Sequence, residues 1–123
     1  MATMPEAAGA TLVALCPAAE IAEGTARGFD PEDDGQDSLF AVRVGGVLSL
    51  WRNACPHEAA PMAWRRDGYL NAEGTRIVCH AHGAEFLPET GLCVAGPCLG
   101  ARLTAACFVI NERGELCARL DKD

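Results

Sequence analysis

Two short segments of this chain bring together the side chains that bind transition metals. Residues 53–61 read NACPHEAAP, and residues 77–86 read IVCHAHGAEF. They hold all three histidines of the chain and two of its seven cysteines, as Cys-x-His and then Cys-x2-His. The four candidate ligands are Cys55, His57, Cys79 and His82. Thiolate and imidazole are the ligands of zinc sites and of some iron–sulfur centres, so the pattern predicts a metal centre built by two loops.

The ligand types alone leave two kinds of centre open. One is a closed, tetrahedral zinc site, and the other is a [2Fe–2S] cluster with the cysteines on one iron and the histidines on the other. A common zinc-finger order places both cysteines before both histidines. Here each loop supplies one of each, which favours an asymmetric cofactor with two metal atoms. Pro56 and Pro61 stiffen the first loop. Gly83 leaves room for the backbone to lie beside a ligand in the second loop.

The remaining sequence predicts a small, mostly antiparallel β domain. Apolar runs on either side of Gly45-Gly46 are typical of a hairpin, because both turn positions accept positive φ. Residues 17–24 predict one helical turn, and the acidic stretch 27–37 predicts a surface loop. The expected strands are 11–16, 38–44, 47–51, 75–79, 102–110 and 115–120.

Length and charge narrow the function. A chain of 123 residues with 50% apolar residues is expected to form one domain over 1–123, with a loose terminus at 1–10. The net charge of −7 argues against nucleic acid as a partner. The uncharged run 7–19 is shorter than the roughly 20 residues of a membrane span, and Glu6 is unlike a secretory signal. We therefore expect a cytoplasmic protein with reduced thiols and no membrane partner.

The segments CPHEAAPM, CHAHGAEF and TGLCVAGPCLGARL together resemble the Rieske iron–sulfur domain, and in particular the Rieske-type ferredoxins. The resemblance covers roughly residues 39–110. It implies an all-β fold, a small antiparallel sandwich or barrel-like Rieske fold with an inserted two-loop cluster-binding subdomain at about 52–98. Cys55 and Cys79 would bind the inner iron of a [2Fe–2S] cluster, and His57 and His82 the outer iron. Gly96-Pro97 would form a third loop that covers the cluster.

The resemblance also implies a function and partners. The chain would be an electron-transfer protein without catalytic residues of its own, because the cofactor performs the chemistry. It would carry one electron at a time from a flavin-dependent reductase to a terminal oxygenase or a similar acceptor. His57 and His82, with Glu58 and Trp64 around them, would lie at the docking surface.

Some residues depart from the family pattern or stand outside it. The interval 62–77 is longer than usual for these ferredoxins, and His80 is interpreted as a bystander beside the ligand His82. Cys16, Cys107 and Cys117 lie in apolar patterns and are expected to be core thiols. Cys93 and Cys98 are expected to be reduced thiols packed near the cluster, with a redox-active disulfide as the alternative.

Other functions remain open at this point. A zinc-stabilised interaction module would be colourless, and a redox-sensing accessory subunit would lose its cluster on oxidation without serving a reductase. An enzyme with a Cys-His nucleophile is disfavoured, because no orienting acid stands beside the ligand pairs.

Overall fold

The computed structural model describes residues 10–31, 33, 35, 37–54, 56, 68–79 and 83–121. Within them the chain forms nine strands and one short 3-10 helix, η1. The elements are β1 (Ala10–Pro17), η1 (Ala18–Glu20), β2 (Thr25–Phe29), β3 (Leu39–Val44), β4 (Val47–Arg52), β5 (Ile77–Cys79), β6 (Ala84–Phe86), β7 (Cys93–Ala95), β8 (Phe108–Ile110) and β9 (Glu115–Asp121). In this described part, no helix has the length and apolar character that crossing a membrane requires.

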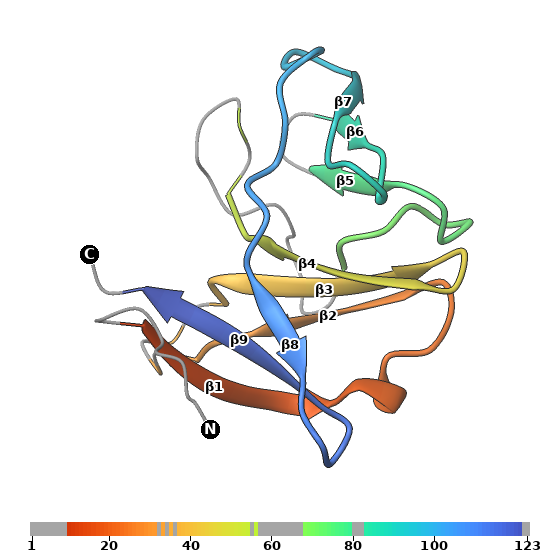
Figure 1. The fold of residues 1–123 in the computed structure, drawn as a ribbon. Helices are drawn as coiled ribbons and strands as arrows, with labels where there is room; N and C mark the ends of the chain where they lie inside the picture. Colours follow the sequence, from red (N-terminus) through yellow and green to blue (C-terminus); the bar gives the residue numbers. More distant parts are fainter. Residues whose placement is uncertain are drawn as a thin grey trace.

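The strands form three antiparallel sheets of three strands each. Their orders are β1-β9-β8, β2-β3-β4 and β5-β6-β7. Figure 1 shows them as a lower, a middle and an upper sheet. The prediction of an all-β, antiparallel fold is confirmed.

The central strand of the middle sheet, β3, is buried on both faces over its first four residues. Successive side chains of a strand point to opposite faces. Phe40 and Val42 therefore face one core while Leu39 and Ala41 face another, and all four are 0–1% exposed. The upper core holds Phe40, Val42, Trp51, Tyr69, Ile77, Cys79, Ala84, Phe86, Cys93, Cys98 and Leu103. The lower core holds Cys16, Ile21, Phe29, Leu39, Ala41, Leu50, Leu116 and Ala118.

The predicted hairpin around Gly45-Gly46 is confirmed. β3 and β4 pair from Leu39 with Arg52 to Val44 with Val47, and both glycines have positive φ, at 64° and 81°. The carboxylate of Glu23 accepts hydrogen bonds from the backbone N–H groups of Gly45 (2.6 Å) and Gly46 (2.8 Å). The turn is thus held by a side chain from a distant part of the sequence.

The acidic loop predicted over 27–37 is wrong at its start. Residues 25–29 form β2, which pairs with β3 from Thr25 opposite Arg43 to Phe29 opposite Leu39. Gly28 is a poor strand residue by propensity, and it misled the prediction. A Cβ there would collide with the side chains of Asp37 and Tyr69, so the packing requires glycine in this strand.

The predicted strand 102–110 is also shorter than expected. Only Phe108–Ile110 is a strand, and the residues before it run along β4. There Arg52 donates a backbone hydrogen bond to Thr104 (2.9 Å), and Ala106 donates one to Leu50 (3.0 Å). This segment connects the upper sheet to the lower one (Figure 1). Its apolar residues therefore belong to a connection between sheets and not to one long strand. The predicted second strand of the closing hairpin is confirmed as β9.

The cysteines predicted to be core thiols divide into two groups. Cys16 and Cys117 are buried, as expected, and burial raises the pKa of the Cys16 thiol. Cys107 is exposed, so that prediction is wrong. It directly precedes β8, where Phe108 packs against the lower core while Val109 and Ile110 are exposed. Within the predicted loose terminus 1–10, Ala10 pairs with Asp121, and residues 1–9 lie outside the described part.

Candidate metal centre

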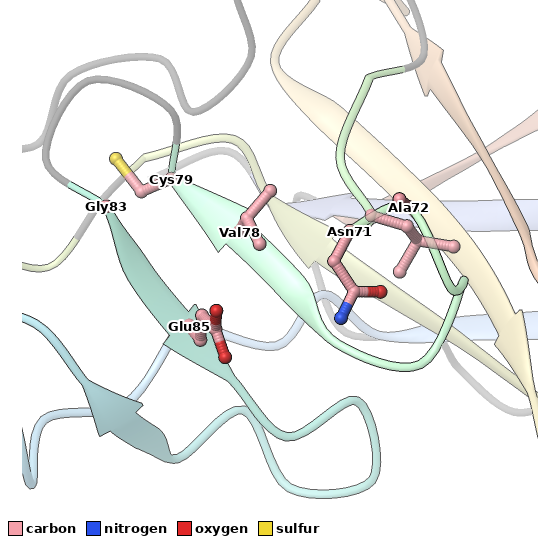
Figure 2. Close-up of a pocket in the computed structure, with 7 residues that line it drawn as sticks. Asn71, Ala72, Val78, Cys79, Gly83 and Glu85 are labelled. Carbon is pink, nitrogen blue, oxygen red and sulfur yellow. The ribbon is translucent and has the colours of Figure 1, made fainter.

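Cys79 is the predicted ligand that the structure describes, and it sits at a fixed point of the upper sheet. It is the last residue of β5 and pairs with Ala84, the first residue of β6. Its side chain is 0% exposed within the upper core. The N–H of Gly83 donates to the carbonyl of Cys79 (2.8 Å), which closes the turn between the two strands. Figure 2 shows Cys79 and Gly83 facing each other across the ends of these strands.

The strand that carries Cys79 is anchored to the middle sheet by Tyr69, a residue that the sequence reasoning missed. The Tyr69 ring stacks on Phe40, with 4.2 Å between centroids and 3° between planes. Its carbonyl accepts a hydrogen bond from the N–H of Val78 (2.9 Å), and Leu70 forms a bridge with Ile77. A single tyrosine after a charged stretch was the available signal. Its packing fixes the height of β5 above the middle sheet.

Two glycines shape the backbone around Cys79. Gly83 has φ +73°, and a Cβ on it would meet nothing within 4 Å. Its role is therefore conformational, since L-residues rarely adopt this φ. Gly96 has φ +102°, and a Cβ on it would lie 2.6 Å from the Cα of Ala84. The predicted third loop therefore packs directly against the residue that pairs with Cys79.

The first predicted loop leaves the middle sheet at the end of β4. Asn53 ties this exit to residues before β3: its backbone N–H donates to Ser38 (2.9 Å), and its side-chain amide donates to the carbonyl of Asp37 (2.9 Å). The arrowheads of β4 and β5 point to the same side in Figure 1. The two segments predicted to carry ligands therefore start from the same side of the molecule, which is compatible with two loops that share a metal.

The other three predicted ligands, Cys55, His57 and His82, lie outside the described residues, as do His80, Glu58 and Trp64. Among the residues that the structure does describe, no three histidine, cysteine, aspartate or glutamate side chains gather as a metal site. The described part of the predicted centre is thus Cys79 with the backbone next to it.

A pocket of about 540 Å³ lies beside Cys79 (Figure 2). Its lining comes from the turn before β5 and from the strands β5 and β6: Leu70, Asn71, Ala72, Val78, Cys79, Gly83 and Glu85. The Asn71 side-chain oxygen accepts backbone hydrogen bonds from Thr75 (2.8 Å) and Arg76 (3.1 Å). Glu85 forms an ion pair with Arg76 at 3.3 Å. Asn71 thus stabilises the turn before β5, and Glu85 is paired with a residue of that turn. The polar side chains of the pocket wall are therefore engaged in contacts that hold the fold.

The comparison with protein families decides the classification. The model of the Rieske [2Fe-2S] domain matches residues 11–111, which is most of the chain. The chain belongs to the Rieske [2Fe-2S] domain family. Its cofactor is therefore a [2Fe–2S] cluster. No curated protein sequence matches the chain significantly.

Solved structures of Rieske proteins share this fold. The ferredoxin of carbazole 1,9a-dioxygenase from Nocardioides aromaticivorans IC177 is 26% identical, with a TM-score of 0.64 over 88% of this chain and 96% of that chain. The Sphingomonas yanoikuyae B1 ferredoxin is 26% identical, with a TM-score of 0.66 over 92% of this chain and all of that chain (100%). The terminal oxygenase of carbazole 1,9a-dioxygenase from Novosphingobium sp. KA1 is 18% identical and shares the fold over 30% of its length, with 91% of this chain covered and a TM-score of 0.64.

The described residues fit the Rieske cofactor. Cys79 places a buried sulfur at the end of a strand, out of contact with bulk water. The turn after it requires a glycine at 83, and the third loop comes close enough at Gly96 to shield that end of the sheet. Thiolates and imidazoles are also the donor set of this family's cluster.

Proposed function

We propose that this chain is a Rieske-type ferredoxin that accepts one electron from a flavin-dependent reductase and delivers it to a terminal oxygenase. The observation that carries the proposal is the extent of the match. The chain aligns with 96% and 100% of two ferredoxins at 26% identity, and with 30% of an oxygenase at 18%. The aligned part therefore accounts for nearly the whole of a ferredoxin and for less than a third of an oxygenase.

The choice of partners rests on the same relatives. One similar structure is a complex of reduced oxygenase and oxidized ferredoxin in carbazole 1,9a-dioxygenase, whose matched chain is 25% identical with a TM-score of 0.67 over 91% of this chain and 95% of that chain. A ferredoxin that delivers electrons to an oxygenase must itself be reduced. A flavin-dependent reductase suits the donor role, because flavins can take up electron pairs from nicotinamide cofactors and release them singly.

We infer that Cys55, His57, Cys79 and His82 hold the cluster, with the cysteines on the inner iron and the histidines on the outer one. The cluster supplies a centre that gains and loses one electron. Cys79 contributes a thiolate that the upper core shields from water. His57 and His82 contribute neutral imidazoles in place of two negative thiolates, which makes reduction easier than at an all-cysteine site.

The proposal is tested on the purified full chain, prepared without oxygen. Two iron atoms and two acid-labile sulfides per chain are expected, with a visible spectrum and an EPR signal on reduction by dithionite that uses one electron per chain. His82→Ala should lose the EPR signal and much of the iron. His80→Ala is the matched control, because it removes an imidazole two positions away in the same segment and should retain both.

Different outcomes would replace the proposal. A colourless chain with one zinc and no sulfide would make it a zinc-stabilised module. Retention of iron and EPR signal in His82→Ala, with loss in His80→Ala, would instead exchange the roles of these two histidines.

A further inference from the structure

A second sulfur pair lies in the upper core, apart from the four predicted ligands. Cys93 is the first residue of β7, and Cys98 lies in the loop that follows it. The Cys98 thiol donates to the Cys93 sulfur at 3.3 Å, and the Cys93 thiol donates to the carbonyl of Ala95 at 3.1 Å. No disulfide bond joins them in this structure. A carrier of single electrons needs neither of these thiols, so their contact calls for a separate explanation.

Backbone hydrogen bonds hold the two sulfurs in place from both sides. The N–H of Cys93 donates to Ala101 (2.8 Å), and the carbonyl of Cys93 accepts from Gly100 (3.1 Å). The carbonyl of Cys98 accepts from Ala101 (2.8 Å). A disulfide bond is about 2.05 Å long, so the sulfurs need to approach by little more than about 1 Å from their 3.3 Å separation.

The two thiols differ in their access to solvent. Cys93 is 1% exposed and Cys98 is 9% exposed. Exposed residues flank Cys98, namely Pro97 before it and Leu99, 69% exposed, after it. Both cysteines are buried, but Cys98 less completely, so a small oxidant that enters beside Pro97 and Leu99 would meet Cys98 before Cys93. This is the arrangement of an attacking and a resolving cysteine.

We propose that Cys93 and Cys98 form a two-electron thiol–disulfide site that a hydroperoxide oxidises. The deprotonated Cys98 sulfur attacks the hydroperoxide, the O–O bond breaks, and an alcohol leaves (water in the case of hydrogen peroxide). Cys98 is then a sulfenic acid. The Cys93 sulfur attacks it, the S–S bond forms, the S–O bond breaks, and water leaves with the remaining protons. Two thiols and one hydroperoxide thus give one disulfide, one alcohol and one water, and a dithiol reductant restores both thiols.

The bond would close a ring across residues 93–98. That ring contains Gly96, which packs against Ala84, the strand partner of Cys79. Oxidation would therefore fix the third loop on the side of the upper sheet where the predicted cluster lies. The inference rests on the two sulfurs and their loop and does not require the proposed electron-transfer partners.

The test uses the full chain with its cluster and graded additions of hydrogen peroxide, followed by alkylation in denaturant and mass spectrometry of the peptides. The visible spectrum is recorded at every dose. We expect Cys93 and Cys98 to become protected from alkylation together, in equal amounts and with the loss of two hydrogen atoms, while the spectrum is retained. Dithiothreitol should reverse this protection. The exposed Cys107 is the internal control for a thiol without a sulfur partner.

Two single variants test the order of the steps. Cys93→Ser should leave Cys98 as a sulfenic acid that dimedone traps, whereas Cys98→Ser should leave Cys93 as a thiol. The proposal is overturned if both cysteines remain thiols at doses that oxidise Cys107. It is equally overturned if the disulfide appears only after the spectrum has bleached, or if Cys93 is protected in Cys98→Ser. These readouts are independent of electron transfer, so they distinguish failure here from failure of the proposed function.

Discussion

At the scale of single residues, the surroundings of Cys79 depend on a close approach between two backbones. Gly96 and Ala84 are twelve positions apart in the sequence, and the absence of a side chain at Gly96 allows them to touch. A Cβ at Gly96 would lie 2.6 Å from the Cα, 3.0 Å from the Cβ and 3.1 Å from the N of Ala84. These atoms belong to a strand that cannot move aside without disturbing the pair of Cys79 with Ala84.

Gly96→Ala should therefore destabilise the chain by about 2–4 kcal/mol, from overpacking combined with an alanine at φ +102°. Urea unfolding measures this loss. Gly100→Ala is the matched control, because Gly100 lies in the same loop with φ +89° and a Cβ there would meet nothing within 4 Å. It should cost only about 1 kcal/mol, from backbone strain. Equal losses in the two variants would show that the contact with Ala84 is unimportant.

At the scale of elements, the sequence predicts the strands and turns that depend on neighbouring residues. The β3–β4 hairpin was predictable because Gly45 and Gly46 satisfy a turn that needs positive φ at both positions. β2 was not, because Gly28 occurs in a strand only where distant side chains leave no room for a Cβ. β6 and β7 have three residues each, too few for a visible alternation. Their existence depends on pairing with residues elsewhere in the chain.

The same division applies to the site. The spacing of cysteine and histidine, together with the family resemblance, pointed to Cys79, which lies at a strand end as expected. The contact of Gly96 with Ala84, the stacking of Tyr69 on Phe40 and the contact of Cys93 with Cys98 all join residues through the folded core. Spacing along the chain carries no signal for the first two of these contacts.

The β3–β4 turn offers a test of a long-range contribution to one element. Glu23→Ala removes the carboxylate that accepts two backbone N–H groups from Gly45 and Gly46. Hydrogen bonds to a charged group at an exposed site are each modest, so we expect a loss of about 0.5–1 kcal/mol in urea unfolding. Glu112→Ala, in the exposed turn between β8 and β9, should change stability by less than about 0.5 kcal/mol. A Glu23→Ala variant as stable as the parent chain would show that the glycines alone hold the turn.

At the scale of the whole molecule, the three sheets divide the chain into two parts that share β3. Cys79, the predicted ligand within the described part of the chain, belongs to the upper core. The sheets also differ in extent. β1 and β9 pair over seven residue pairs, whereas β5 and β6 pair over three. The upper sheet is therefore held by fewer pairs between its strands than the lower sheet.

Removal of the metal should consequently loosen the molecule unevenly. After treatment with acid and a chelator, amide protons of β5, β6 and β7 should exchange with solvent about tenfold faster or more, because the loops next to these strands lose their shared anchor. Amide protons of β1 and β9 should keep their protection, because the lower core is intact. Hydrogen exchange followed by NMR or mass spectrometry measures both groups in one sample, so the lower sheet serves as the control. Uniform loss of protection would mean that the two cores unfold as one unit, and no change in the upper sheet would mean that its packing alone holds Cys79 in place.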